Sequence, residues 1–225
     1  MTPTRIALIH ATPLAIDPIK DVIVRHWPEA QCQHLLDDSL SQDRVRDGHL
    51  TPAMVQRFVT LARYCQAAGA QGILFTCSAF GPAIEAAAQA TGLPTLKPNE
   101  AMFEQALAMA QAGRPLRVGL VATFEASIAS MREEFMDLAR SREVQAEVTG
   151  CFVPEAMSDL AQGQAQAHHN KVARAVAQLP NCDVILLAQF SMAAAQALAQ
   201  LSTSTPVLSS PDCAILALRN QLTHA

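Results

Sequence analysis

One cysteine stands where a thiol could carry out chemistry. Cys77 follows the apolar run Ile73–Phe75, precedes a helical pattern that begins near Gly81, and has hydroxyl-bearing neighbours in Thr76 and Ser78. A thiol at the N-terminus of a helix has a lowered pKa, because the positive end of the helix dipole stabilises the thiolate. The position therefore predicts a nucleophile or an acid/base, and the alternative is a small buried core residue.

Other polar side chains also come directly after apolar runs. His10 follows the run Ile6–Ile9 and is a candidate second acid/base, because the ordinary pKa of histidine lies near 6.5. The alternative for His10 is a hydrogen bond to loop backbone. Hydroxyl and amide side chains at comparable points are expected to line the same site, and ordinary turn or helix-cap chemistry is the alternative. The substrate-binding candidates are Thr12, Thr76, Ser78, Thr123, Gln189, Ser191, Ser209 and Ser210.

Several further residues are expected to have structural roles. The pair His168-His169 sits in a polar helical pattern, which favours a solvated helix face. The residues around Asp37 and Asp47 are expected to form a polar connection. Cys213 opens the last helical pattern and is a minor candidate for the site. Three phenylalanines that follow strand ends could line an apolar pocket or belong to the core; these are Phe80, Phe124 and Phe190.

The six cysteines show no CxxC pair and no regular spacing. This pattern argues against a zinc site and a disulfide framework, so reduced thiols and no metal are expected. The remaining four cysteines, Cys32, Cys65, Cys151 and Cys182, are expected to be core or surface residues.

These residues must be positioned by alternating strands and helices. Short apolar runs such as Val184–Leu187 alternate with longer Ala- and Leu-rich helical stretches, which is typical of parallel sheets covered by helices. Strands are predicted at 5–9, 31–36, 72–75, 95–96, 117–121, 145–152, 183–187 and 207–208. Helices are predicted near 15–27, 51–68, 81–91, 99–112, 125–141, 164–178, 191–200 and 212–222.

An internal repeat divides the chain into two similar halves. The run Ile6–Ile9 recurs 112 residues later as Val118–Val121, and Ile73–Phe75 recurs at the same offset as Ile185–Leu187. The prolines of Leu93–Leu96 and its counterpart at 205–208 are also in register. Several coincidences at one offset predict two pseudo-symmetric α/β lobes.

The predicted lobes are residues 1–98 with 209–225, and residues 99–208. Because ligands bind beyond the carboxyl ends of strands in open α/β sheets, the active site is expected in a cleft between the lobes.

Composition excludes several classes of function. The 225 residues are 50% hydrophobic and 16% charged, with a net charge of −4. A sizeable core is therefore possible, and a basic footprint for nucleic acid or an acidic membrane is not expected. There is no apolar run long enough to span a membrane, no leader-like segment and no glycine-rich phosphate loop. We expect a cytoplasmic protein.

The segment Ile73-Leu74-Phe75-Thr76-Cys77-Ser78-Ala79-Phe80-Gly81, together with the segment 183–192, resembles the aspartate/glutamate/hydantoin racemase superfamily. The resemblance extends over essentially the whole chain. It implies two pseudo-symmetric α/β lobes, no cofactor, a small carboxylate substrate and a homodimer. It also implies a catalytic cysteine after the equivalent strand of each lobe, one removing the α-proton and the other returning it on the opposite face.

This chain departs from that pattern at the second cysteine. Gln189 is the counterpart of Cys77 at the 112-residue offset, and an amide cannot exchange protons at neutral pH. The function expected from the resemblance is racemisation or epimerisation next to a carboxylate, with Cys77 as acid/base. The alternatives are a decarboxylase of a substituted malonate that uses one thiol, as in the related arylmalonate decarboxylases, and a small-carboxylate-binding protein without activity.

Overall fold

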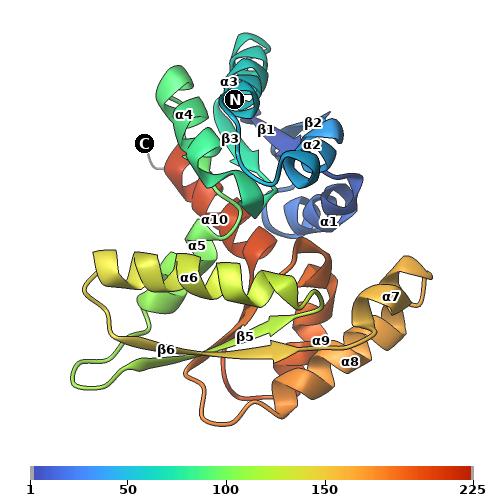
Figure 1. Cartoon of the computed structure of the whole chain (residues 1–225), viewed down its shortest axis with the longest axis vertical. Coiled ribbons are helices and arrows are strands. Elements are labelled where there is room, and N and C mark those ends of the chain that lie inside the picture. Colours follow the sequence, from blue (N-terminus) through green and yellow to red (C-terminus); the bar gives the residue numbers. More distant parts are fainter. Residues whose placement is uncertain (1–2, 224–225) are drawn as a thin grey trace. The chain divides into compact units, whose positions relative to one another are not determined.

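The computed structural model, which describes residues 3–223, contains two four-stranded parallel sheets (Figure 1). The strand orders β2-β1-β3-β4 and β6-β5-β7-β8 are the same topology used twice. The strands of the first sheet are β1 (Arg5–His10), β2 (Gln31–Leu36), β3 (Gly72–Phe75) and β4 (Thr95–Leu96). Those of the second are β5 (Leu116–Ala122), β6 (Ala146–Phe152), β7 (Val184–Leu187) and β8 (Val207–Ser209). The predicted fold of two similar parallel α/β lobes is confirmed.

Helices follow the strands in both halves of the sequence. In the first half they are η1 (Pro13–Ala15), α1 (Ile16–His26), α2 (Ser39–Asp47), α3 (Pro52–Ala67), η2 (Ser78–Phe80), α4 (Gly81–Thr91) and α5 (Glu100–Leu107). In the second half they are α6 (Ala126–Ser141), α7 (Ala156–Ala161), α8 (Ala165–Ala177), η3 (Phe190–Ala195), α9 (Gln196–Leu201) and α10 (Ser210–Thr223).

The strand register supports the repeat and shows where it breaks. Ile9 pairs with Phe75 in the first sheet, and the residues 112 positions later, Val121 and Leu187, pair in the second. The edge strands β2 and β6 are instead offset by 116 residues, because Ile6 pairs with Cys32 while Val118 pairs with Val148. The difference accompanies the helix before the edge strand, which has 11 residues in α1 and 16 in α6.

The chain divides into two compact units. The first holds the described residues up to Ala101 and those from Ala214 onward, and the second holds Met102–Cys213. Residues 1, 2, 224 and 225, which belong to the predicted first lobe, lie outside the described residues.

In the first unit both faces of the sheet are covered. Alternate residues of a strand point to opposite faces, and Ile73 and Phe75 belong to a core formed with α3 and α4. Gly72 faces the other side, where a Cβ atom would lie 2.8 Å from the Leu222 side chain of α10. A side chain at this position would therefore force the Leu222 side chain to move, and glycine allows the close approach of helix to sheet.

In the second unit, α6 and α8 lie against opposite faces of the sheet. A Cβ at Gly150 of β6 would meet Ile128 of α6. The neighbouring Cys151 packs against the core that contains Val172 and Val176 of α8.

Two short helices were not predicted. The stretch between Asp37 and His49, expected to be a polar connection, contains α2, in which Leu40 is the buried residue. Gly48 ends α2 with a left-handed backbone (φ 70°), which glycine adopts without strain. The second short helix, α7, buries Ala156. With one core residue each, these helices leave no apolar periodicity to detect.

Two predicted helices differ in extent or type. The helix expected over 99–112 is α5, which ends at Leu107. The helix expected over 191–200 begins as the 3-10 segment η3 and becomes α-helical at Gln196.

The solvated face predicted for His168 is wrong. The His168 side chain is 0% exposed. It lies on the buried stripe of α8 with Val172 and Val176, at the four-residue spacing that places side chains on one helix face. His169 is half-buried.

Candidate active site at the strand ends

In the first unit, three of the predicted site residues lie at the carboxyl ends of neighbouring strands. His10 is the last residue of β1, and Thr76 and Cys77 follow β3 directly. The amide of Thr76 donates to Ile9 O at 3.1 Å, which extends the pairing of the two strands by one residue. Parallel pairing thus brings His10 and Thr76 together from positions 66 residues apart.

His10 is fully buried and uses both ring nitrogens. A hydrogen bond of 2.9 Å joins its Nδ1 to Thr76 Oγ1, and one of 3.0 Å joins its Nε2 to Nδ1 of His34. Burial, together with the charges of His34 and Lys20, lowers the pKa of His10 to about 4. His10 is therefore a neutral imidazole at pH 7, with each nitrogen held by a side chain rather than by loop backbone.

His34 was missed in the sequence. It lies in β2, in register with Leu8 of β1, so it shares a sheet face with His10 two residues further along β1. A histidine two residues before the end of the predicted strand 31–36, together with one directly after the predicted strand 5–9, is the signal that could have revealed the pair.

Cys77 is half-buried and occupies the N-cap position of a helical segment. Its extended backbone (φ −129°, ψ 120°) precedes η2, which continues into α4. The Cys77 side chain packs against the core under α3 and α4, whereas Thr76 contacts His10. Ser78 is exposed.

The other five cysteines are in surroundings that disfavour the thiolate. Burial raises the pKa of Cys32 to about 11 and, with the charge of Asp212, that of Cys213 to about 12. Burial also raises the pKa values of Cys65, Cys151 and Cys182. The Cys213 thiol donates to Gln105 Oε1 at 3.1 Å, so it has a structural partner.

In the second unit, Gln189 occupies the place that corresponds to Cys77. Its Oε1 accepts hydrogen bonds from the amide of Thr123 at 2.8 Å and from Thr123 Oγ1 at 3.2 Å. Its Nε2 donates to Ser127 Oγ at 2.7 Å, and that hydroxyl donates to Phe124 O. The amide thus ties the ends of β5 and β7 to the start of α6. Ser127 was not predicted, and its helix-start position gave no distinctive signal.

The remaining candidates occupy three different places. The buried Ser209 donates to the Asp212 carboxylate, and Ser210 begins α10 and is also buried. Thr12 is half-buried in the turn before η1, and Ser191 is half-buried within η3.

Of the three phenylalanines after strand ends, two belong to the core. Phe80 and Phe190 are buried, whereas Phe124 is 53% exposed. Phe124 alone of these three could offer apolar surface to a ligand.

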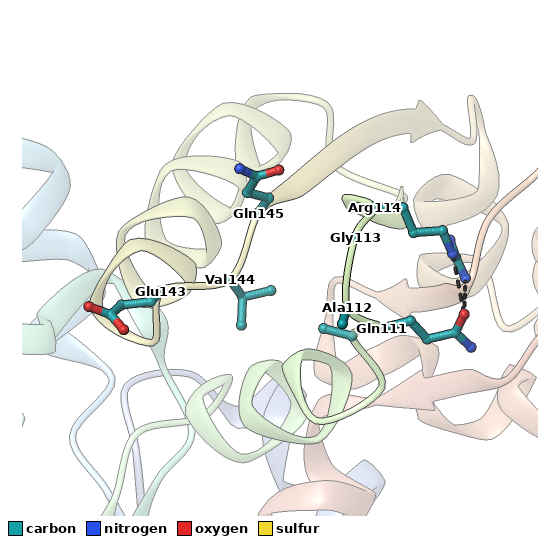
Figure 2. Close-up of a pocket in the computed structure, with 8 residues that line it drawn as sticks. Gln111, Ala112, Gly113, Arg114, Glu143, Val144 and Gln145 are labelled. Atoms are coloured by element: carbon teal, nitrogen blue, oxygen red, sulfur yellow. Dashed lines mark hydrogen bonds between the residues drawn. The ribbon is translucent and has the colours of Figure 1, made fainter.

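A pocket of about 430 Å³ lies elsewhere, beside the residues that precede β5 and β6 in the second unit (Figure 2). Figure 2 shows the Arg114 side chain directed at Gln111. The Arg114 guanidinium donates to Gln111 Oε1 at 3.1 Å and to Asp183 Oδ2 at 2.7 Å. The Arg114 guanidinium is already paired with Asp183, and the pocket lies at the amino ends of the strands. The pocket is therefore separate from the candidate site.

Within residues 3–223, no group of three or more His, Cys, Asp or Glu side chains is arranged to hold a metal ion. None of the helices in the same range combines the length and apolar character needed to cross a membrane.

Comparison with solved structures finds the same fold in proteins of low sequence identity. An aspartate racemase homologue from Pyrococcus horikoshii is 14% identical over 98% of this chain and 99% of its own, with a TM-score of 0.73. Allantoin racemase from Klebsiella pneumoniae is 15% identical over 98% of this chain and 88% of its own, with a TM-score of 0.70. Unliganded arylmalonate decarboxylase is 18% identical over 96% and 92%, with a TM-score of 0.60.

No curated protein matches the sequence. The model of the Asp/Glu/hydantoin racemase family matches residues 20–218, which is most of the chain. Together with the doubled parallel sheet and the Thr-Cys-Ser segment after β3, this match shows that the chain belongs to the Asp/Glu/hydantoin racemase family.

Proposed function

We propose that this protein is an isomerase or lyase that moves a proton at the carbon next to a carboxylate, with Cys77 as the acid/base. The supporting observation is the placement of Cys77, a half-exposed thiol immediately after β3 and at the start of η2 and α4. The other cysteines are set in surroundings that raise their pKa values. No cofactor is part of the proposal.

In the isomerase form, the Cys77 thiolate removes the α-proton of an amino acid or related small acid. The electron pair of the C–H bond moves into the carboxylate and gives an enediolate. Return of the proton by the Cys77 thiol restores the original configuration, so inversion needs a proton delivered to the opposite face, by solvent or by a second acid. An α-proton is weakly acidic, so the step needs donors fixed around the enediolate oxygens. We propose Thr12, Thr76, Ser78, Ser191 and Ser210 as sources of such donors, whereas the hydroxyls of Thr123 and Ser209 donate to Gln189 and Asp212.

One observation favours a decarboxylase of a substituted malonate as the second candidate. Only one of the two equivalent strand ends carries a thiol, and the amide of Gln189 at the other is committed to Thr123 and Ser127. In this reaction the bond to one carboxylate breaks, CO₂ leaves, and the electron pair forms the enediolate. The Cys77 thiol then protonates the α-carbon, and water restores the thiol proton.

His10 as a second acid/base remains a prediction. Its burial and neutral state favour instead a role in positioning Thr76. Cytoplasmic location also remains a proposal, supported by six free cysteines, which are typical of a reducing compartment. A homodimer is proposed from the family resemblance and is tested by light scattering after gel filtration.

The test is a screen of amino acids, hydantoins and substituted malonates for α-proton exchange in heavy water and for CO₂ release. We expect turnover that is lost in Cys77→Ala and retained in Cys182→Ala. Cys182 is a suitable control because it precedes β7 and packs against the core of the second unit. Full turnover in Cys77→Ala would assign the chemistry to another group.

A protein that only binds a carboxylate would give a different result. Alkylation of Cys77 by iodoacetamide should rise with pH and be slowed by substrates if the protein is an enzyme. An inert Cys77 thiol in a protein that binds small carboxylates, with no turnover in the screen, would identify a binding protein on this fold.

A further inference from the structure

A chain of hydrogen bonds leads from His34 to the residue beside Cys77. The His34 and His10 ring planes lie within 12° of each other, with centroids 5.2 Å apart and the facing nitrogens 3.0 Å apart. The two nitrogens therefore point at each other within nearly one plane, which is the geometry of a well-formed hydrogen bond. The other ring nitrogen of His10, Nδ1, forms a hydrogen bond of 2.9 Å with Thr76 Oγ1.

The hydrogen of the Thr76 hydroxyl has only a weak partner in this arrangement. Thr76 Oγ1 lies 3.5 Å from Ile9 O, beyond the usual length of a hydroxyl hydrogen bond. That carbonyl already accepts the Thr76 amide at 3.1 Å. A ligand oxygen could therefore take over the hydroxyl hydrogen at little cost.

The direction in which these hydrogen bonds are donated decides whether the Thr76 hydroxyl can donate to a ligand. If His34 Nδ1–H donates to His10 Nε2, then His10 Nδ1–H donates to Thr76 Oγ1, and the Thr76 hydrogen is free to point at an anion. If the chain runs the other way, Thr76 donates to His10 and offers only lone pairs. A neutral imidazole has one donor and one acceptor, so both directions are chemically complete.

We propose that His34 is a positioning residue that acts through His10 to aim the Thr76 hydroxyl hydrogen at a carboxylate or enediolate oxygen bound beside Cys77. The inference rests on the proposed function, because it assumes an anion at this strand end. It adds His34, a residue of the edge strand β2, to the residues that prepare the site for an anion.

The surroundings of His10 and His34 favour the neutral form of both imidazoles. Burial and the charge of Lys20 lower the pKa of both rings, and the charge of Asp17 partly offsets this at His34. Both charged residues belong to α1, and Lys20 Nζ pairs with Asp17 Oδ1 at 3.2 Å. Neutral rings are needed, because each must accept as well as donate.

The isosteric variants His34→Gln and His34→Glu separate the two directions. The glutamine amide can donate to His10 Nε2 and keep the original direction, whereas a glutamate carboxylate at pH 8 can only accept and reverses it. Nitrogen-15 NMR of the imidazoles reports the tautomer without any substrate. We expect the His10 proton on Nδ1 in the unmodified protein and in His34→Gln, and on Nε2 in His34→Glu. A His10 proton on Nε2 in the unmodified protein would overturn the proposal.

The effect at the site is read from alkylation of Cys77 by iodoacetate and by iodoacetamide, with the Cys77 peptide resolved by mass spectrometry. The two reagents differ in that iodoacetate carries a carboxylate. We expect the rate ratio of iodoacetate to iodoacetamide to fall roughly tenfold from His34→Gln to His34→Glu, because one hydrogen bond to a charged group is lost.

A glutamate also repels an anion directly, so the same pair is compared in a Thr76→Val background. If the effect travels through Thr76, the difference between His34→Gln and His34→Glu disappears there. A difference that persists in Thr76→Val, or equal ratios in the original background, would overturn the proposal. Failure to find any substrate would instead count against the proposed function, because neither the NMR nor the alkylation measurement requires turnover.

Discussion

Gln189 shows at the scale of one residue why the two strand ends differ chemically. Its amide accepts from the Thr123 amide and hydroxyl and donates to Ser127. These bonds use the side chain to join the ends of β5 and β7 to the beginning of α6. The second unit thus uses this position for structure, while the first unit presents a thiol there.

Replacing Gln189 by leucine should therefore lower stability. The buried amide of Thr123 would lose its acceptor, and an unpaired buried donor costs about 1–3 kcal/mol. We expect Gln189→Leu to reduce the free energy of unfolding in urea by that amount. The exposed Gln178 provides the matched control, and Gln178→Leu should be nearly neutral. Equal stability of the two variants would show that the amide bonds contribute little.

His10 should make the protein sensitive to mild acid. Its pKa is about 4 in the folded state, against about 6.5 in an unfolded chain. Between these values the unfolded state binds the additional proton, so stability falls as pH falls through this window. Over the whole window, this difference in the pKa of His10 lowers the free energy of unfolding by about 3 kcal/mol.

Urea unfolding between pH 7 and pH 4 measures this dependence. His10→Asn should flatten the fall in stability over that range, whatever its effect at pH 7, whereas His49→Asn should leave the slope unchanged because His49 is exposed. A slope unaffected by His10→Asn would mean that the pKa of His10 is the same in the folded and the unfolded state.

At the scale of elements, helix α8 buries a polar side chain, the imidazole of His168. Both ring nitrogens of His168 are buried without a hydrogen-bond partner among the described residues. Burial lowers the pKa of the imidazole, and His169 adds to this. Burying polar atoms without partners is unfavourable.

His168→Leu should stabilise the protein, by about 1 kcal/mol at pH 8. The gain should grow at pH 5, because the unfolded imidazole then binds a proton that the buried one resists. Thermal unfolding of this variant and of His169→Leu, which alters the half-buried neighbour, tests the expectation. A large loss of stability in His168→Leu at pH 8 would reveal a polar partner for the ring.

The same elements show what a sequence pattern can predict. The strands were predicted closely because runs such as Gly72–Phe75 are buried on both faces and bounded by polar residues. The helix α2 was missed because Leu40 is its one buried residue. The burial of His168 was not predicted because the residues around it are polar, although its four-residue spacing to Val172 places both on the buried face of α8.

At the scale of the whole molecule, the doubled sheet follows from the 112-residue repeat. The structure confirms this offset for three of the four equivalent strands, β1 with β5, β3 with β7 and β4 with β8. The repeat also identified Cys77 and Gln189 as equivalent positions. It could not identify His34, because β2 and its counterpart β6 are offset by 116 residues and the histidine has a partner only through strand pairing. Side-chain contacts of this kind depend on three-dimensional register rather than on local pattern.

The central claim is that one thiol, Cys77, performs the proton transfer. A single donor protonates an enediolate from one face, so exchange with solvent should outrun inversion. The most direct measurement follows one enantiomer of a substrate from the screen in heavy water, with deuterium entry read by NMR and inversion by chiral chromatography. We predict that deuterium enters the α-carbon faster than the configuration inverts, and that Cys77→Ala abolishes both. Inversion as fast as exchange in the unmodified protein, or exchange that survives in Cys77→Ala, would contradict the account.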